Sequence, residues 1–171
     1  NFGPDSQFTV ELYFMSISDE AEYFFEKNQL GRRADRSRAY DLTSQDTFAL
    51  AAKQFVEITP SLRGNVNRVT DRLSSKNAQV VTLSTLRTMV ETYFQRDDPP
   101  SVAEAEAAAT RMSQFYEMLV AVRPELGVLS VSDRVATRQR SMADQAVLMH
   151  AYAMLMRAFS EDYEAEGRAA T

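Results

Sequence analysis

The sequence lacks cysteine entirely and contains one histidine, His150, and five glycines among its 171 residues. Without cysteine, disulfides, thiolate catalysis and cysteine-ligated metals are excluded, and a single imidazole argues against a histidine-based zinc or iron site. The glycines form neither the Gly-x-Gly-x-x-Gly nor the Gly-x-x-x-x-Gly-Lys pattern that binds phosphates. We therefore expect no metal, no cofactor and no enzymatic activity from these residues.

Long apolar runs are also missing. No run approaches the roughly 20 residues that cross a bilayer, and no signal peptide is visible. The chain begins with Asn1 in place of methionine, and we interpret it as a trimmed or fragmentary piece of a cytoplasmic protein. Its length, with 44% hydrophobic and 25% charged residues, indicates one globular domain large enough to bury a core.

His150 stands among apolar neighbours, between Met149 and Ala151 in the most apolar part of the chain. No nucleophile lies at a spacing that would pair with it. The sequence therefore favours a histidine held by a hydrogen bond in the interior or at an interface over a catalytic base.

Apart from one alternating segment, the hydrophobic spacing is that of helices. Residues 7–16 alternate large apolar and polar side chains, which predicts a strand. The fold class is therefore mainly α (α+β), a helical domain with an N-terminal strand. Helices are predicted from Ser18 to Gly31, from Thr43 to Thr59, across residues 83–94, from the capping box of Ser101 and Glu104 to Arg123, and from Ser141 to Phe159.

One domain is predicted across residues 1–160, with a sub-boundary at the Asp-Asp-Pro-Pro run of residues 97–100. The last helix is apolar on more than one face and is expected to be the most buried element. Residues 161–171 are expected to form a disordered tail.

The charge is uneven along a chain whose formal net charge is −5. Residues 1–30 carry one Lys against six acids, residues 31–76 carry nine Lys/Arg against five acids, and residues 77–171 carry nine against thirteen. A basic middle between acidic flanks can form a local positive face, although an excess of this size is weaker than that of a dedicated DNA-binding module.

Two groups of polar residues in this basic middle form the candidate DNA-binding site. Arginine and asparagine are the residues that contact phosphates and base edges. A solvated loop has the same composition, and the dipole at a helix C-terminus gives a structural reason for the first two arginines. The candidate DNA contacts are Arg32, Arg33, Arg36 and Arg38 in one loop, and Arg63, Asn65, Asn67, Arg68, Arg72 and Lys76 in a second.

The segment FFEKNQLGRR, from Phe24 to Arg33, resembles a Phe-x-x-x-Asn segment followed by a small residue and basic residues in DGQHR-domain proteins. Phe24 and Asn28 match the aromatic residue and the asparagine, and Gly31 opens the Gly-Lys-Lys-like sequel. Later segments of the same family resemble residues 60–66, 81–86 and 140–155 of this chain.

This family includes DndB, a regulator associated with DNA phosphorothioate (sulfur) modification. The resemblance implies a DNA-binding protein with a ParB-like α+β core that takes part in regulation, including transcription regulation. The Asp-Gly-Gln-His-Arg signature itself is absent from the chain. In the family it lies upstream of the predicted strand, so the resemblance implies the C-terminal part of such a protein, without any activity that needs the signature.

Two other readings stay open. The chain is alternatively a helical interaction module, in which the Val102–Leu119 seam and the methionine-rich last helix form a homo-oligomer and the arginines only aid solubility. It is otherwise the non-catalytic part of a nuclease or nucleotide hydrolase. A steep salt dependence of DNA binding distinguishes the first reading from the interaction module, because phosphate contacts release counterions.

Overall fold

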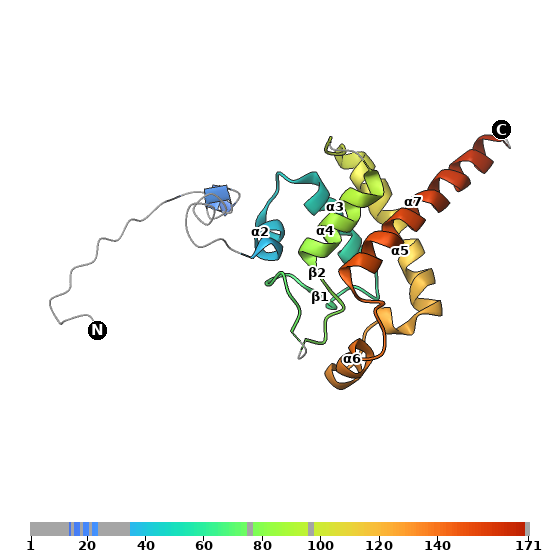
Figure 1. Ribbon diagram of the computed structural model, residues 1–171. Helices are drawn as coiled ribbons and strands as arrows, with labels where there is room; N and C mark the ends of the chain where they lie inside the picture. The colour runs from blue at the N-terminus through green and yellow to red at the C-terminus, as the bar shows by residue number, and fades with distance from the viewer. Residues whose placement is uncertain are drawn as a thin grey trace.

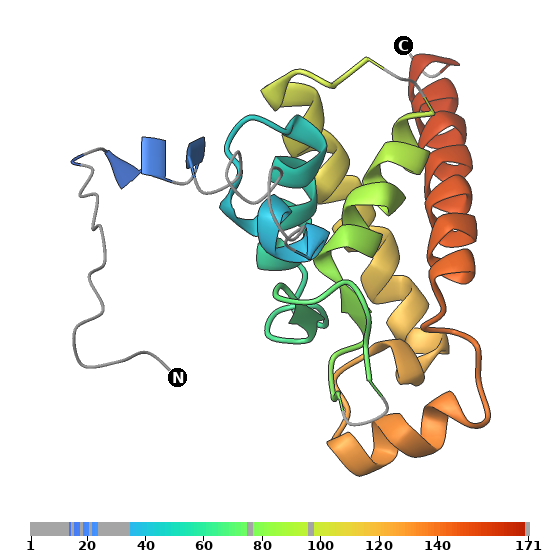
Figure 2. The same cartoon turned by 60° about the vertical axis from the view of Figure 1, so that its left-hand side comes forward.

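The computed structural model describes a body of helices with a short parallel sheet at one side (Figures 1 and 2). This architecture confirms the predicted fold class, mainly α (α+β). The structure describes residues 35–74, 77–95 and 98–169, with side chains as far as Glu161, together with Phe14, Ser16, Ile17, Asp19, Glu20, Glu22 and Tyr23.

The elements follow the chain in a simple order. They are α2 (Arg36–Leu42), α3 (Thr47–Ile58), β1 (Val66–Asn67), β2 (Val81–Thr82), α4 (Leu83–Phe94), α5 (Val102–Val122), the 3-10 helix η1 (Pro124–Leu126), α6 (Val131–Arg138) and α7 (Ala146–Ala169). Two of them, α4 and α5, match the predicted helices closely.

The N-terminal elements lie mostly outside the described residues. Of the predicted strand at residues 7–16, only Phe14 and Ser16 are described, and neither belongs to a strand or a helix. The helix predicted from Ser18 is visible at Ile17, Asp19, Glu20, Glu22 and Tyr23, which are helical.

Side-chain caps fix where two helices begin. Ser101 accepts a hydrogen bond from the Glu104 backbone N–H, and the Glu104 carboxylate accepts one from the Ser101 N–H, so the predicted capping box is confirmed. The predicted start of α3 at Thr43 was wrong. Asp46 is the N-cap there, because its carboxylate accepts a hydrogen bond of 3.0 Å from the Ala49 N–H.

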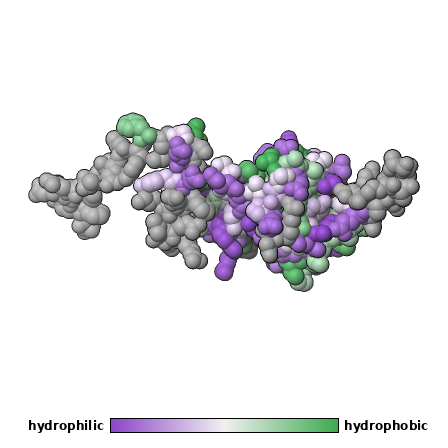
Figure 3. Space-filling model, turned by 90° about the horizontal axis from the view of Figure 1, so that it is seen from above, coloured by the Kyte–Doolittle hydropathy of each residue, from purple (hydrophilic) through white to green (hydrophobic). Residues whose placement is uncertain are grey.

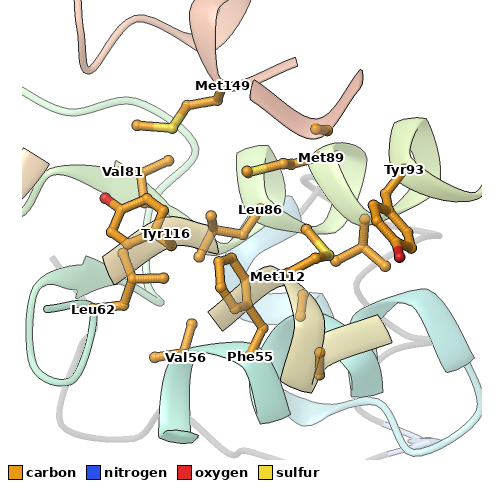
Figure 4. Packing of buried hydrophobic residues seen from close by; sticks show 14 of the residues in the cluster. Phe55, Val56, Leu62, Val81, Leu86, Met89, Tyr93, Met112, Tyr116 and Met149 are labelled. Atoms are coloured by element: carbon orange, nitrogen blue, oxygen red, sulfur yellow. The ribbon is translucent and has the colours of Figure 1, made fainter. Parts of the chain in front are cut away.

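The core lies between α3, α4 and α5, with α7 adding one face (Figure 4). Phe55 of α3 and Tyr116 of α5 are completely buried, and their rings meet edge to face with centroids 5.8 Å apart. The Tyr116 hydroxyl donates to the Leu126 carbonyl at 3.1 Å, which gives its buried oxygen a partner. These three helices form the rigid base on which α2 and the sheet rest.

The last helix differs from its prediction in position and burial. It begins at Ala146 rather than near Ser141 and continues to Ala169, where a disordered tail was expected. Met149, Ala153 and Met156 are buried, but Phe159 is 60% exposed. The expectation that the last helix is the most buried element was therefore wrong. α7 lies at the edge of the body, whereas α3 lies at its centre.

The small sheet and two short helices were not predicted. Val66 pairs with Val81 and Asn67 with Thr82 in a parallel register. The two strands therefore bring together the ends of a polar segment that was expected to be a loop. Two arginines of α6 hold the connection between the strands: Arg138 donates to the Asn77 and Gln79 carbonyls at 2.9 and 2.7 Å, and Arg134 donates to the Ala78 carbonyl at 3.1 Å. The fold of this segment thus depends on contacts with residues about sixty positions later in the chain.

His150 lies half-buried on α7, with Nδ1 3.0 Å from the Thr92 hydroxyl of α4. The prediction of a hydrogen-bonded histidine at an internal interface is confirmed. The contact ties the two helices together and gives the imidazole a structural role.

Candidate nucleic-acid interface

Asp71 connects the two groups of arginines. Its Oδ1 accepts a hydrogen bond from the Ser37 N–H at 2.7 Å, and its Oδ2 accepts from the Arg36 N–H at 2.8 Å and from Arg36 Nε at 3.3 Å. The residue before α2, Asp35, makes no capping bond with its own side chain. Asp71 therefore caps α2 from a distant part of the sequence and holds residues 66–72 against the N-terminus of that helix.

The electrostatics of Asp71 agree with this capping role. Burial acts to raise the pKa of the Asp71 carboxyl, but the hydrogen bonds from Arg36, Ser37 and Ser84 outweigh it, so the pKa lies below its ordinary value. Asp71 is therefore a charged cap at neutral pH.

Further pairs extend the contact along the surface. Arg68 donates to Asp41 of α2 at 3.2 Å and also pairs with Glu57 at the end of α3. The Nε of Arg63 donates to the Glu57 carbonyl at 3.1 Å, where the C-terminal dipole of α3 favours a cation. We call the exposed surface of α2 and of residues 63–72 the arginine face.

The predicted DNA contacts are distributed unevenly over this face. The side chains of Arg38 and Arg72 are exposed and form no ion pair or hydrogen bond with another residue of the described part. Arg36 remains 74% exposed despite its pair. Arg36 and Arg38 lie on a helix, where the sequence predicted a loop. Outside the described residues lie Arg32, Arg33 and Lys76, as do the family-motif positions Phe24, Asn28 and Gly31.

The two asparagines shape the backbone of the face. Asn65 is buried, and its amide donates to the Ser61 carbonyl at 3.1 Å and to the Gly127 carbonyl at 3.0 Å. The Asn67 side-chain oxygen accepts from the N–H groups of Val69 and Thr70, both at 2.9 Å, as in an Asx turn. The Asn65 amide nitrogen and the Asn67 side-chain oxygen are thus used within the fold.

Acids balance much of the positive charge. Five arginines of the face, at positions 36, 38, 63, 68 and 72, stand beside four carboxylates, those of Asp35, Asp41, Glu57 and Asp71. Sequence reasoning counted these acids but missed the pairing, since no spacing along the chain links Asp71 to Arg36 or Asp41 to Arg68. In the described part of the chain, the positive excess of the face therefore comes from Arg38, Arg63 and Arg72, none of which pairs with a carboxylate.

Two further cations, on α3 and α4, contact α2 or the residue that follows it. Neither was among the candidate residues predicted from the sequence. The Lys53 ammonium donates to the Thr43 carbonyl at 2.7 Å, and burial lowers its pKa. The Arg87 guanidinium stacks on the rings of Tyr40 and Phe48, 5.3 and 5.1 Å from their centroids. Figure 3 shows a mostly hydrophilic surface at the side of the body where α2 lies.

The fold and the face together define a mainly helical domain with an exposed, arginine-rich edge. Among the described residues there is no cluster of three or more side chains suited to a metal ion, and no helix is long and apolar enough to span a bilayer.

A family model, DndB, described as DNA-sulfur modification-associated, matches residues 5–168. The chain therefore belongs to the DndB family, and the resemblance seen in its sequence is confirmed. The comparisons with curated proteins and with solved structures gave no match. Family membership associates the chain with DNA sulfur modification.

Proposed function

We propose that the chain is a DNA-binding regulatory component of a DNA sulfur-modification system and that it contacts the DNA backbone through the arginine face. The observation that carries the proposal is the capping of α2 by Asp71. This contact holds Arg36 and Arg38 against the segment that bears Arg68 and Arg72, so that cations from two distant stretches share one surface.

The partners of each side chain suggest the kind of contact. Arg38 and Arg72 are exposed cations, which suits phosphates, and Asn65 and Asn67 are already engaged with the backbone. The described part of the face thus offers positive charge and few side chains free to hydrogen-bond to base edges. This favours contact with the DNA phosphate backbone over direct sequence recognition. No catalytic step is assigned to these residues.

The test replaces Arg38 and Arg72 together by Ala. DNA affinity near 0.1 M salt is expected to fall roughly 10- to 100-fold, and the slope of log K against log salt to flatten by about two units, one for each phosphate that the two arginines no longer neutralise. The loss of affinity should be similar for duplexes of different sequence. Fluorescence anisotropy across a salt series measures both quantities.

The matched control is Arg140→Ala. Arg140 is also exposed but lies between α6 and α7, and its Nε donates only to the Ala136 carbonyl at 3.2 Å. Its replacement should leave affinity and salt slope unchanged. Parental binding by the Arg38/Arg72 variant would refute the proposal, and the helical interaction module would then be the better reading.

A second variant addresses the arginines outside the described residues. Changing Arg32 and Arg33 together to Ala is expected to weaken binding on many sequences alike and to reduce the salt slope by about one unit for each of the two arginines that binds a phosphate. The proposal assigns both side chains to the DNA surface, and folding stability should then hardly change, since surface charges contribute little to it. An unchanged salt slope in the same anisotropy assay would identify both residues as ordinary surface charge.

A further inference from the structure

The guanidinium of Arg68 is held between two carboxylates. Its Nη1 donates to Asp41 Oδ1 at 3.2 Å, and its Nη2 pairs with Glu57 Oε1. Asp41 lies in the last turn of α2 and Glu57 in the last turn of α3. Arg68 therefore bridges the C-terminal ends of two helices on the arginine face, at the side of the body where α2 lies near β1 (Figures 1 and 2).

The Glu57 side chain contributes little to the fold. It is 58% exposed, and within the described part of the chain its carboxylate bonds only to Arg68. An acid in the last turn of a helix also opposes the helix dipole, which favours cations there. Folding alone therefore gives no reason for a carboxylate at this position.

The other acids of the face are better placed for the structure. Asp71 caps α2 through two backbone N–H groups. Asp41 is only 21% exposed and connects Arg68 to α2. Asp35 precedes the first turn of α2, where the helix dipole favours an acid. Glu57 is thus the acid whose main effect is on the charge of the face.

The effect of one acid is large because the excess of positive charge is small. The five arginines of the face stand beside four carboxylates, a formal excess of one charge. Without the charge of Glu57 the same five arginines would stand beside three carboxylates, and the excess would be two.

The backbone that carries Arg68 does not depend on the ion pairs of its side chain. Asn67, the residue before it, pairs with Thr82 in the sheet, and its side-chain oxygen accepts from the Val69 and Thr70 N–H groups. The Arg68 side chain is 33% exposed and has several rotatable bonds. Its guanidinium can therefore exchange one anion for another without movement of the chain.

We propose that Glu57 restrains DNA binding by occupying Arg68, and that a DNA phosphate competes with the Glu57 carboxylate for this guanidinium. The inference rests on the proposed function and adds a regulatory contact to the same face. Phosphate and carboxylate oxygens both accept from guanidinium N–H groups in a similar geometry, so a phosphate oxygen can take the place of Glu57 Oε1. An exposed ion pair is weak in water, and a phosphate contact that releases counterions can displace it.

The test is Glu57→Gln in the full chain, which keeps the size of the side chain and removes its charge. DNA affinity near 0.1 M salt is expected to rise roughly 3- to 10-fold, and the slope of log K against log salt to steepen by about one unit. In the parent, the carboxylate beside Arg68 cancels the charge that this arginine brings to the phosphate. Fluorescence anisotropy over a salt series measures both quantities, and the urea midpoint should stay at the parental value.

Two comparisons separate this pair from a general effect of charge. Asp35→Asn removes a negative charge from the same face, but Asp35 pairs with no arginine in the described part of the chain. Its effect on affinity should stay below about 2-fold, because salt screens charges that are not in contact. In an Arg68→Ala background, Glu57→Gln should also change affinity by less than about 2-fold and leave the slope unchanged, since the guanidinium that it would free is absent.

An unchanged affinity of the Glu57 variant would overturn the inference. Equal gains from the Glu57 and Asp35 variants, or equal gains with and without Arg68, would also overturn it, because net charge alone would then explain the result. Failure of the proposed function has a different sign. In that case the Arg38/Arg72 variant binds DNA as the parent does, and both proposals are refuted; if that variant is weakened while Glu57→Gln has no effect, only the role of Glu57 is refuted.

Discussion

Replacing Arg134 by Met is expected to lower the free energy of unfolding by about 3–6 kcal/mol, because it removes three charge-assisted hydrogen bonds made by a buried guanidinium and leaves the part-buried Ala78 and Glu125 carbonyls without this donor. Arg134 is completely buried. Its guanidinium donates to the Ala78 carbonyl at 3.1 Å, to the Gly127 carbonyl at 2.6 Å and to the Glu125 carbonyl. These acceptors belong to two segments, the connection between the strands and the turn around η1, so one side chain ties the strand connection to the end of α5.

Urea denaturation measures this effect as a lower midpoint with an unchanged slope. The burial of Arg134 lowers its pKa, and the charge of Asp144 partly offsets this. Arg134→Lys keeps the charge but lacks the planar fork that reaches three acceptors, so it should also destabilise strongly. The comparison variant Arg140→Met, at an exposed position, should change stability by less than about 0.5 kcal/mol. Equal midpoints for the Arg134 and Arg140 variants would contradict the assigned role.

Asp71→Ala is expected to lower stability by about 2–4 kcal/mol, since it removes charge-assisted hydrogen bonds to the Arg36 and Ser37 N–H groups. It should also weaken DNA binding about 10-fold, by the proposed function, because α2 loses its cap and its position. The predicted fall in DNA affinity distinguishes two explanations. Removal of an acid from a face near DNA would strengthen binding if net charge alone decided it.

The Asp71 effect has a defined pH dependence. The folded-state pKa of Asp71 is depressed, so its contribution to stability is fully present above the ordinary carboxyl pKa of about 3.9. It is lost as the pH falls through the lower folded-state value. Urea midpoints of parent and variant should therefore differ at neutral pH and converge once the pH has fallen below the depressed folded-state pKa of Asp71.

An exposed acid provides the control for Asp71. Asp98, between α4 and α5, lies away from α2 and is exposed, so Asp98→Ala should leave stability and DNA binding near their parental values. Tighter DNA binding by the Asp71 variant would show that the position of α2 does not matter for the arginine face.

The parts of the fold that local sequence determines were predictable. The capping box of Ser101 and Glu104 and the apolar face of α4 depend on residues within one or two turns of each other, and both are confirmed. The sheet was missed because its strands have two residues each and are held by Arg134 and Arg138 of α6. α7 was judged too buried because its apolar composition includes side chains that the fold leaves exposed, such as Phe159.

The arginine face was predictable in composition but not in structure. Counting charges identified the basic middle of the chain, yet it could not reveal that Asp41, Glu57 and Asp71 pair with its arginines. Those pairs join residues 11 to 35 positions apart, beyond any helical or strand period. The structural role of Asn65 could not be predicted for the same reason, because its partner Gly127 is far along the chain.

The distant cap of α2 also constrains the order of folding on the ribosome. A helix of seven residues is too short to be stable by itself. α2 takes its cap from Asp71 and its aromatic stack from Arg87 of α4, so a nascent chain that ends before these residues lacks both partners. The fold of α2 therefore cannot be completed first during synthesis. It docks only after α3, the strands and α4 have emerged, which makes α2 a late-folding element of the protein.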